Sequence, residues 1–569
     1  MSFSSQISDN RDESNSPGLF CKSLPKDPFD VIIIGGGPGG YVAAIRAAQL
    51  GLKTALVEGK HLGGVCLNWG CIPTKALLKS ASMLASASHM ESFGLTLPPG
   101  DIHIDLDVMV GRSRQLASTL QSGIKGLLAK NGVSVFSAWA SFESLSANLN
   151  PFPTHHAPPS SNTTNRSEAD PLAVSNPAGA WGQTAGKNSD AGACPAGAPP
   201  DTPHSSVLHT LRLTNEDQEI GHLFGKNIVI ATGARARTLF PDDLGIWSAS
   251  QAMTPEKRPE SILIIGAGAI GIEFASFYRT LGTHVTVVEQ SDTILPIEDD
   301  EIVAIAAKSF IKQGMVLETG STVHHVVKNP DESYTATIKN IKTGEEKSWT
   351  GERILVAIGV IGNTESLGLD HTAVRTEKGH IVTYTHHTTD ELGVYAIGDV
   401  AGAPWLAHKA SHEGMACIEY IAGLKTHPSD PSLIPGCTYS MPQIASIGLT
   451  ERAAAAQGAI KVGRFPFSAN GQAMAYEEST GLVKVIFDEK TGELLGAHMV
   501  GAGVSELIQG FVIAKTMQAT EADLQHIIFP HPTFSEMMHE AVLDADNRGL
   551  HLFRAKKPGE KMDTAKPLP

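Results

Sequence analysis

The sequence predicts a mixed α/β protein with two Rossmann-like domains and a C-terminal α+β domain. Two observations predict the Rossmann-like domains: a strand, a glycine-rich turn and a helix occur in this order twice, and each time a second strand follows and ends in a glutamate. The third observation is a change of pattern after Pro435, where strands at 482–487 and 494–500 are followed by an amphipathic helix over 505–517. This change predicts a separate α+β domain.

The composition is that of a globular protein with several domains. The chain has 569 residues, of which 41% are apolar and 18% charged, and domains of roughly 100–200 residues would number three or four. Its net charge of −15 argues against a nucleic-acid partner, because phosphate binding depends on clustered Lys and Arg. No uncharged apolar run reaches the roughly 18 residues that a membrane span needs.

The first repeated unit begins near the N-terminus. Strands are expected over residues 29–34 and 52–57, with a helix over 41–50 between them. The turn after the first strand carries three spaced glycines, namely Gly35, Gly37 and Gly40, and Glu58 follows the second strand.

The second unit has the same layout. Strands are expected over residues 261–265 and 284–288, and the helix between them ends near residue 281. Its glycines are Gly266, Gly268 and Gly271, and its terminal acid is Glu289. The last glycine precedes the acid by 58 − 40 = 18 positions in the first unit and by 289 − 271 = 18 in the second.

This spacing predicts two dinucleotide sites. The first glycine forms the tight turn, the second lets a pyrophosphate approach the backbone, and the third lets the helix pack on the strand. The pyrophosphate then lies at a helix N-terminus, where free N–H groups favour negative charge. Glu289 would accept hydrogen bonds from a ribose and repel a 2′-phosphate, and no arginine immediately follows it, so NAD is favoured over NADP.

The remaining domain boundaries follow from these units. The polar segment 1–27 has neither the apolar core of a secretory signal nor the composition of a transit peptide, so we expect a disordered tail on a cytoplasmic protein. Between Pro151 and Ser206 stand ten prolines and only four large apolar residues, which predicts a disordered insertion. The expected domains are the first dinucleotide-binding domain at 28–250, the second at 251–379, a central segment returning to the first at 380–434, the C-terminal domain at 435–555 and a tail at 556–569.

Two cysteines, Cys66 and Cys71, follow the first unit at a spacing of five. In a regular helix their Cα atoms would lie about 8–9 Å apart, whereas a disulfide needs about 4.4–6.8 Å. A bridge therefore requires a distorted turn at residues 68–70, which Gly70 permits. Two unrelated thiols remain the alternative for the spacing alone. Beside a dinucleotide fingerprint, a strained bond in a reducing compartment indicates a catalytic pair.

A histidine between two prolines, His531, stands near the C-terminus with Glu536 five residues later. Thiol–disulfide exchange is helped by such a base, and a carboxylate partner fixes its tautomer. Taken alone, a pair of this kind is most often structural, and the chain has 23 histidines. Its interpretation as an acid–base pair therefore depends on the two cysteines.

Together these segments resemble the dihydrolipoamide dehydrogenases, which are two-dinucleotide flavoprotein disulfide reductases. The resemblance runs from about residue 28 to about 552 and is interrupted by the insertion, which the family pattern lacks. Its most specific parts are GGVCLNWGCIPTK at 63–75, YAIGD at 395–399, LAHK at 406–409 and HPTFSE at 531–536. It implies an FAD domain, an NAD domain and a C-terminal dimerisation domain.

The resemblance also implies roles for individual residues. FAD would be bound by the first fingerprint, Glu58, Thr232, Gly233, Ala234, Asp399 and Ala407, and NAD by the second fingerprint, Glu289, Val323 and Gly359. Lys75, one helical turn after Cys71, would reach the flavin and pair with Glu273. Cys71 would be the flavin-side thiol and Cys66 the one that exchanges with substrate. His531, oriented by Glu536, would come from the other subunit of a homodimer.

The implied reaction is oxidation of dihydrolipoyl groups with reduction of NAD through FAD. No lipoyl-domain segment precedes the first unit, so we expect the lipoyl group on a partner, either the acyltransferase of a 2-oxo-acid dehydrogenase complex or the glycine cleavage carrier. A metal ligand set is not expected.

Three alternatives have features that this sequence lacks. A glutathione-type reductase would carry cationic residues for NADP after the second fingerprint, where Glu289 stands. A mercuric reductase would end in a vicinal cysteine pair, but no cysteine follows Cys437. A non-catalytic flavoprotein scaffold would not need Cys66, Cys71, His531 and Glu536 together.

Overall fold

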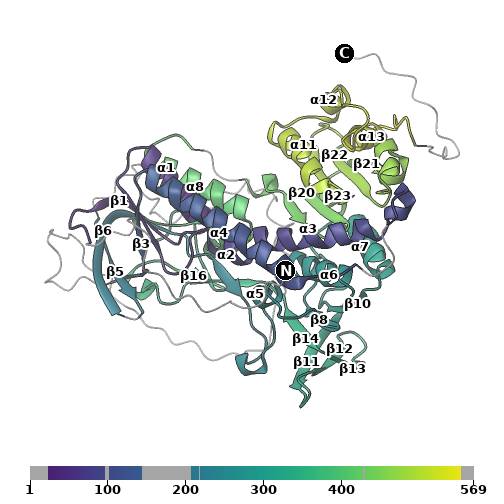
Figure 1. Ribbon diagram of the computed structural model, residues 1–569. Helices are drawn as coiled ribbons and strands as arrows, with labels where there is room; N and C mark the ends of the chain where they lie inside the picture. The colour runs from purple at the N-terminus through teal and green to yellow at the C-terminus, as the bar shows by residue number, and fades with distance from the viewer. Residues whose placement is uncertain (1–23, 97–101, 144–206, 217, 427–429, 553–569) are drawn as a thin grey trace.

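Three large β-sheets form the cores of the computed structural model (Figure 1), which describes residues 24–96, 102–143, 207–216, 218–426 and 430–552. The disorder predicted for 151–206, for 556–569 and for most of 1–27 falls outside these ranges. Within them, Leu24 packs against the core of the first domain. The mixed α/β architecture with a C-terminal α+β domain confirms the predicted fold class.

The first sheet combines a parallel and an antiparallel part. Its parallel strands follow the order β3-β2-β1-β6-β18, and the first half of β6 pairs in antiparallel fashion with β5, which pairs with β4. The bounds are β1 (Phe29–Ile34), β2 (Thr54–Glu58), β3 (Ser134–Ser137), β4 (Trp139–Phe142), β5 (His209–Asn215), β6 (Gln218–Ile230) and β18 (Val394–Ala396). Strand β6 is long because its first half pairs with β5 and its second half with β1.

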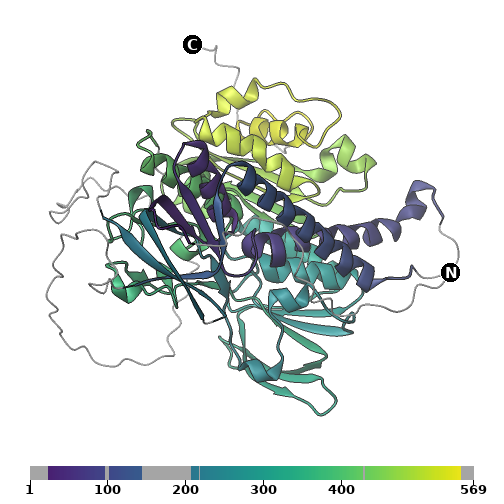
Figure 2. The same cartoon turned by 60° about the vertical axis from the view of Figure 1, so that its left-hand side comes forward.

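Helices cover one face of this sheet. In Figure 1, α1 (Pro38–Gln49) and α8 (Ala407–Ile421) lie side by side over the strands. Helix α1 begins three positions before the expected 41, with Pro38 at its N-terminus, where a missing N–H costs nothing. Figure 2 shows α3 (Cys71–Ala87) and α4 (Leu106–Lys130) running together away from the sheet.

The second parallel sheet has the order β10-β9-β8-β14. Helices α6 and α7 pack on one face, and the antiparallel meander β11-β12-β13 packs on the other. The bounds are β8 (Ser261–Ile265), α6 (Ala269–Thr280), β9 (His284–Val288), α7 (Asp300–Lys312), β10 (Val316–Glu318), β11 (Ser321–Lys328), β12 (Tyr334–Asn340), β13 (Glu346–Gly351) and β14 (Arg353–Val356).

The C-terminal sheet is antiparallel, with the order β19-β20-β23-β22-β21. Helices α11 and α13 pack on its strands. The bounds are β19 (Gly436–Thr438), β20 (Gln443–Gly448), β21 (Ile460–Pro466), β22 (Leu482–Asp488), β23 (Leu494–Gly501), α11 (Val504–Thr516) and α13 (Glu536–Ala545). Shorter elements are β7 (Ala234–Ala236), α5 (Ala249–Ala252), β15 (Val360–Gly362), β16 (Thr376–Glu377), β17 (His380–Ile381), α9 (Glu451–Ala455), α10 (Gly471–Ala475) and α12 (Glu521–Gln525).

A buried ionic cluster joins the second and third domains. The Nζ atom of Lys484, on β22, lies 2.6 Å from Asp299, 3.0 Å from Glu301 and 2.7 Å from Glu451, and the Lys484 side chain is only 2% exposed. Asp299 also caps the N-terminus of α7. Because a buried charge is costly without its partners, this cluster fixes α7 against the C-terminal sheet.

The two glycine-rich turns have the same geometry. The first glycines, Gly35 and Gly266, have φ angles of +107° and +104°. A β-carbon on Gly40 would lie 1.8 Å from the Gly35 carbonyl oxygen, and one on Gly271 would lie 2.0 Å from that of Gly266. The helix therefore contacts the turn so closely that only hydrogen fits at the third glycine. Within the described ranges, no helix is long and apolar enough to cross a membrane.

We predict that Gly271→Ala destabilises the protein and that Gly268→Ala does not. A β-carbon at Gly268 has no atom within 4 Å, whereas the added methyl at Gly271 forces α6 away from β8. Overpacking of this kind costs about 1–3 kcal/mol, and an unopposed change stays within about 0.5 kcal/mol. Thermal unfolding followed by circular dichroism measures both variants, and equal melting temperatures would contradict the packing argument.

Candidate active site

The two cysteines lie on either side of a sharp break between two helices. Cys66 is in α2 (Gly64–Trp69), and Cys71 is the first residue of α3. Gly70 between them has φ −146° and ψ −115°, and a β-carbon there would lie 3.1 Å from the Val65 carbonyl oxygen. The expected distortion is therefore present, but it is confined to Gly70, because Asn68 and Trp69 remain helical.

Side chains from α2 and α4 support this turn. The Asn68 amide donates to the carbonyl oxygens of Leu62 and Gly64, both at 2.9 Å. Arg114, on α4, donates to the Asn68 carbonyl oxygen, and its guanidinium lies 4.3 Å from the Trp69 ring centroid. Sequence reasoning did not identify Arg114, because no local pattern links it to the cysteines.

Cys66 and Cys71 are both free cysteines in the structure. Hydrogen bonding with Cys66 lowers the pKa of Cys71, and the charge of Lys75 lowers it further, which together outweigh the opposing effect of burial. The same hydrogen bond, together with burial, raises the pKa of Cys66. The helix N-terminus also favours a thiolate at Cys71. Cys71 is therefore the thiolate of the pair and Cys66 the thiol.

An ion pair joins the first two domains beside this turn. The Lys75 ammonium lies 3.0 and 2.9 Å from the two carboxylate oxygens of Glu273, on α6. Tyr439, from the segment between β19 and β20, donates its backbone N–H to Glu273 at 3.0 Å. The structure thus brings Lys75 and Glu273 together, and it adds Tyr439, which no sequence pattern had indicated.

The two terminal glutamates are held in the same way. Glu58 accepts from the backbone N–H groups of Gly36 and Lys60, both at 2.7 Å. Glu289 accepts from those of Ala267 and Ser291, both at 2.8 Å. The Glu58 oxygen bound by Lys60 also accepts from the His61 N–H, at 3.2 Å. The other Glu58 oxygen and both Glu289 oxygens accept one of these hydrogen bonds each and retain a lone pair for a ribose hydroxyl.

The middle glycine of each turn borders open space. A β-carbon on Gly37 would lie 3.9 Å from its nearest atom, and one on Gly268 would have no atom within 4 Å. The turns therefore leave room where a pyrophosphate would lie, in front of the N-termini of α1 and α6. These two turns and their glutamates fit dinucleotides.

The segment after β6 meets that after β15. The Thr232 hydroxyl donates to the Asn363 carbonyl oxygen at 2.8 Å, and the Asn363 backbone N–H donates to that of Gly233 at 3.0 Å. Ala234 begins β7, which pairs with β15. Sequence reasoning did not identify Asn363.

Asp399 lies in the turn Gly398–Ala401, and its burial raises its pKa to about 6. Helix α8, which begins at Ala407, supports this turn. Lys409 lies 3.0 Å from Glu413, and Glu413 accepts from the Gly398 backbone N–H at 2.7 Å. The i, i+4 spacing of Lys409 and Glu413 was a usable signal for this pair.

The other residues assigned to NAD lie around the second sheet. Gly359 follows β14, with φ +100° and no atom within 4 Å of a β-carbon placed on it. Val323, on β11, packs against the core between the meander and the sheet. The space next to the α-carbon of Gly359 is therefore open.

His531 and Glu536 form a pair at the start of α13. His531 Nδ1 lies 2.8 Å from Glu536, whose other oxygen accepts from the Thr533 backbone N–H at 2.8 Å. Burial raises the pKa of Glu536, but these two hydrogen bonds outweigh it and leave the pKa lowered. The His531 side chain is 81% exposed, and in the described part of the chain no hydrogen bond or ion pair joins it to Cys66.

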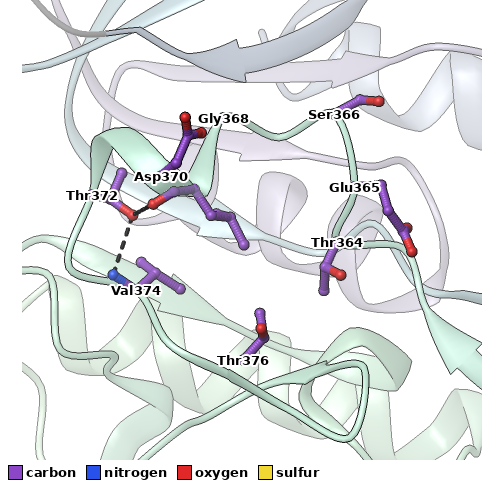
Figure 3. Close-up of a pocket in the computed structure, with 9 residues that line it drawn as sticks. Thr364, Glu365, Ser366, Gly368, Asp370, Thr372, Val374 and Thr376 are labelled. Carbon is purple, nitrogen blue, oxygen red and sulfur yellow. Dashed lines mark hydrogen bonds between the residues drawn. The ribbon is translucent and has the colours of Figure 1, made fainter. Parts of the chain in front are cut away.

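A polar pocket on the loop after β15 is separate from these residues (Figure 3). Thr372 supports the loop by accepting from the Val374 N–H at 3.1 Å and donating to the Leu369 carbonyl at 2.7 Å. None of the predicted site residues lines it. Among the residues with described positions, no cluster of His, Cys, Asp and Glu could hold a metal ion.

Comparisons with known proteins place the chain in a family. Residues 29–156 and 206–414 match the pyridine nucleotide-disulphide oxidoreductases, and 434–542 match the dimerisation domain of the same family. The fold is similar to LpdA from Mycobacterium tuberculosis, with a TM-score of 0.74, 22% identity and coverage of 90% of this chain and 98% of that one. It is also similar to the flavoprotein disulfide reductase RclA from Escherichia coli, with a TM-score of 0.70, 21% identity and coverage of 91% and 99%.

Relatives in sequence are more specific. The chain is 47% identical to a dihydrolipoyl dehydrogenase of Rhizobium etli and 45% identical to one of Zymomonas mobilis, in both cases over 92% of this chain and 99% of the relative. It is 35% identical to the mitochondrial dihydrolipoyl dehydrogenase of Pisum sativum, over 92% of this chain and 93% of the relative. These matches confirm the predicted enzyme class and its cofactors, FAD and NAD. The chain therefore belongs to the dihydrolipoyl dehydrogenases of the pyridine nucleotide-disulphide oxidoreductase family.

Proposed function

We propose that this protein oxidises dihydrolipoyl groups to lipoyl groups and reduces NAD, with Cys66 and Cys71 as the redox pair. The observation that carries the proposal is the placement of the two cysteines: Cys66 lies in α2, and Cys71 begins α3 directly after the break at Gly70, with Lys75 one helical turn later. Hydrogen bonding with Cys66 and the charge of Lys75 lower the pKa of Cys71. An exchange pair needs one sulfur that a substrate thiol can attack and one that leaves as a stable thiolate.

The residues divide the reaction as follows. A substrate thiolate attacks Cys66 of the oxidised pair, and His531 holds the proton that the substrate loses. The Cys71 sulfur leaves as a thiolate, stabilised by Lys75 and by the N-terminus of α3. The second substrate sulfur then displaces Cys66, which closes the lipoyl ring and leaves the reduced pair.

Two electrons must then leave the cysteine pair. Bound FAD would supply a redox group that couples thiol oxidation to hydride transfer. We assign its binding to the first glycine-rich turn, Glu58, Lys75, Thr232, Gly233, Ala234, Asp399 and Ala407. NAD is assigned to the second turn, Glu289, Val323 and Gly359, with Glu273 pairing with Lys75. Two features support these assignments. There is open space at Gly37 and Gly268, and Glu58 and Glu289 each have a carboxylate oxygen that can still accept a hydrogen bond from a ribose hydroxyl.

We propose a homodimer in which His531 of one subunit serves the Cys66 of the other. Support comes from the 81% exposure of the His531 side chain and from the match to a dimerisation domain. Large apolar side chains in the same domain are also exposed, among them Ile528 at 95% and Met517 at 75%. A second subunit would cover such a surface.

The lipoyl group would be carried by a partner, either the acyltransferase of a 2-oxo-acid dehydrogenase complex or the glycine cleavage carrier. The proposed location is the cytoplasm.

A steady-state assay tests the proposed function. Purified protein should reduce NAD with free dihydrolipoamide and should do so far more slowly with NADP, because Glu289 repels a 2′-phosphate. The same assay in reverse should show no reduction of oxidised glutathione. Preference for glutathione with NADP would overturn the proposal.

We predict that His531→Ala slows dihydrolipoamide oxidation by about 10²–10⁴-fold, because the pair loses its base. Oxidation of NADH by an artificial dye does not use the thiols and should be nearly unchanged. His551→Ala is a matched control, because His551 pairs at 2.7 Å with Glu540, which lies on α13 as Glu536 does. This control should retain both activities. Equal loss of both activities in His531→Ala would count against its role.

Mixed dimers test whether the site is shared. We expect the Cys66→Ser homodimer to be inactive and the His531→Ala homodimer to be strongly slowed, whereas their heterodimer should regain activity. One of its two sites then combines the intact Cys66 of one chain with the intact His531 of the other. Differently tagged subunits allow the heterodimer to be purified and assayed, and a heterodimer without activity would place each site within one chain.

A further inference from the structure

The Lys75 ammonium is held by groups from two other domains. Glu273 binds it on one side, at 3.0 and 2.9 Å, and the Tyr439 ring centroid lies 4.4 Å from it. We propose that Tyr439 is a positioning residue whose ring fixes the Lys75 ammonium against Glu273 and beside the Cys71 sulfur. This inference rests on the proposed role of Cys66 and Cys71 as the redox pair.

Tyr439 contacts both members of the ion pair. Its backbone N–H donates to a Glu273 oxygen at 3.0 Å, while its ring faces the ammonium. The Glu273 side chain is only 8% exposed, so the Lys75 ammonium and the Tyr439 N–H must compensate for the loss of hydration of its carboxylate. One residue of the C-terminal domain therefore fixes an ion pair between the first and second domains.

Lys75 needs such a contact because its side chain is long and flexible. That side chain is 32% exposed, so water competes with Glu273 for the ammonium. An aromatic face attracts a cation and at the same time shields it from water. Tyr439 also packs against the core that contains α6 and is thereby held in place.

The position of the ammonium matters for Cys71. The charge of Lys75 lowers the pKa of Cys71, and the charge of Glu273 raises it. If the ammonium moved into solvent, it would no longer offset the negative charge of Glu273 near Cys71. The pKa of Cys71 would then rise. The ring therefore helps to keep Cys71 ionised when the pair is reduced.

Among the neighbouring groups, Glu506 acts electrostatically on Tyr439 and Cys437, and Glu298 acts on Cys437. Burial raises the pKa of Tyr439 to about 12 and that of Cys437 to about 11, so both remain neutral. The hydrogen bond to Cys71 raises the pKa of Cys66, which also remains neutral. Lys75 and Glu273 are then the charged groups that face Cys71.

The test compares Tyr439→Leu, which removes the ring, with Tyr439→Phe, which keeps it. Both retain the backbone N–H. The holoenzyme is reduced with excess dithiothreitol, and the long-wavelength absorbance that a thiolate adds to the adjacent flavin is followed against pH. We expect Tyr439→Leu to raise the apparent pKa of Cys71 by about 0.5–1 and Tyr439→Phe to leave it unchanged.

Tyr384→Leu is the matched control, because Tyr384 is an exposed tyrosine that contacts Arg375 and Asp390. It should titrate as the unmodified protein does. If Tyr439→Leu does not fold, Tyr439→Met replaces the ring by another large apolar side chain and should give the same shift. The titration uses no lipoyl substrate, so its outcome is separate from that of the steady-state assay.

Two results would overturn the inference. An unshifted Cys71 in folded Tyr439→Leu or Tyr439→Met would show that the ring does not position Lys75. Equal shifts in Tyr439→Phe and Tyr439→Leu would assign the effect to the hydroxyl group, which is a different role. A fall in kcat with dihydrolipoamide in Tyr439→Leu, at unchanged KM for NAD, would accompany the expected shift.

Discussion

The ion pair between Lys75 and Glu273 is the contact on which the site depends, because it joins two domains beside the turn that carries Cys66 and Cys71, which we call the redox turn after its proposed function. Lys75 lies one helical turn after Cys71, and Glu273 lies in the helix that follows the second glycine-rich turn. The pair therefore fixes the thiols of the first domain relative to the nucleotide turn of the second. A charge pair with one largely buried member tolerates little displacement, which makes it suitable for this purpose.

The C-terminal domain stabilises this arrangement at two places. Tyr439 contacts both charges of the pair, and the buried cluster around Lys484 fixes α7 of the second domain. Both contacts come from one antiparallel sheet, with Lys484 on β22 and Tyr439 directly after β19. The same sheet supports α13, whose first residue orients His531. The domain thus stabilises the site of its own chain and, in the proposed dimer, supplies a base to the site of the other.

The redox turn itself depends on a single residue without a side chain. Gly70 ends α2 and allows α3 to begin directly at Cys71, so the second sulfur lies at a helix N-terminus. The two cysteines are unequal although they belong to one short segment. Hydrogen bonding between them lowers the pKa of Cys71 and raises that of Cys66, while burial raises the pKa of both and the charge of Lys75 lowers both. The helix N-terminus favours a thiolate at Cys71 in addition.

The sequence alone determined the repeated strand–turn–helix units, the cysteine pair with its required distortion and the His531–Glu536 pair, because each is a local pattern with a fixed spacing. It also predicted the family and its cofactors. Tertiary structure alone decided that Tyr439 faces Lys75, that Arg114 closes the turn at Asn68 and that Lys484 joins two domains. These contacts join residues far apart in the chain, and such pairs have no spacing that a sequence could reveal, since their approach follows from how whole domains pack.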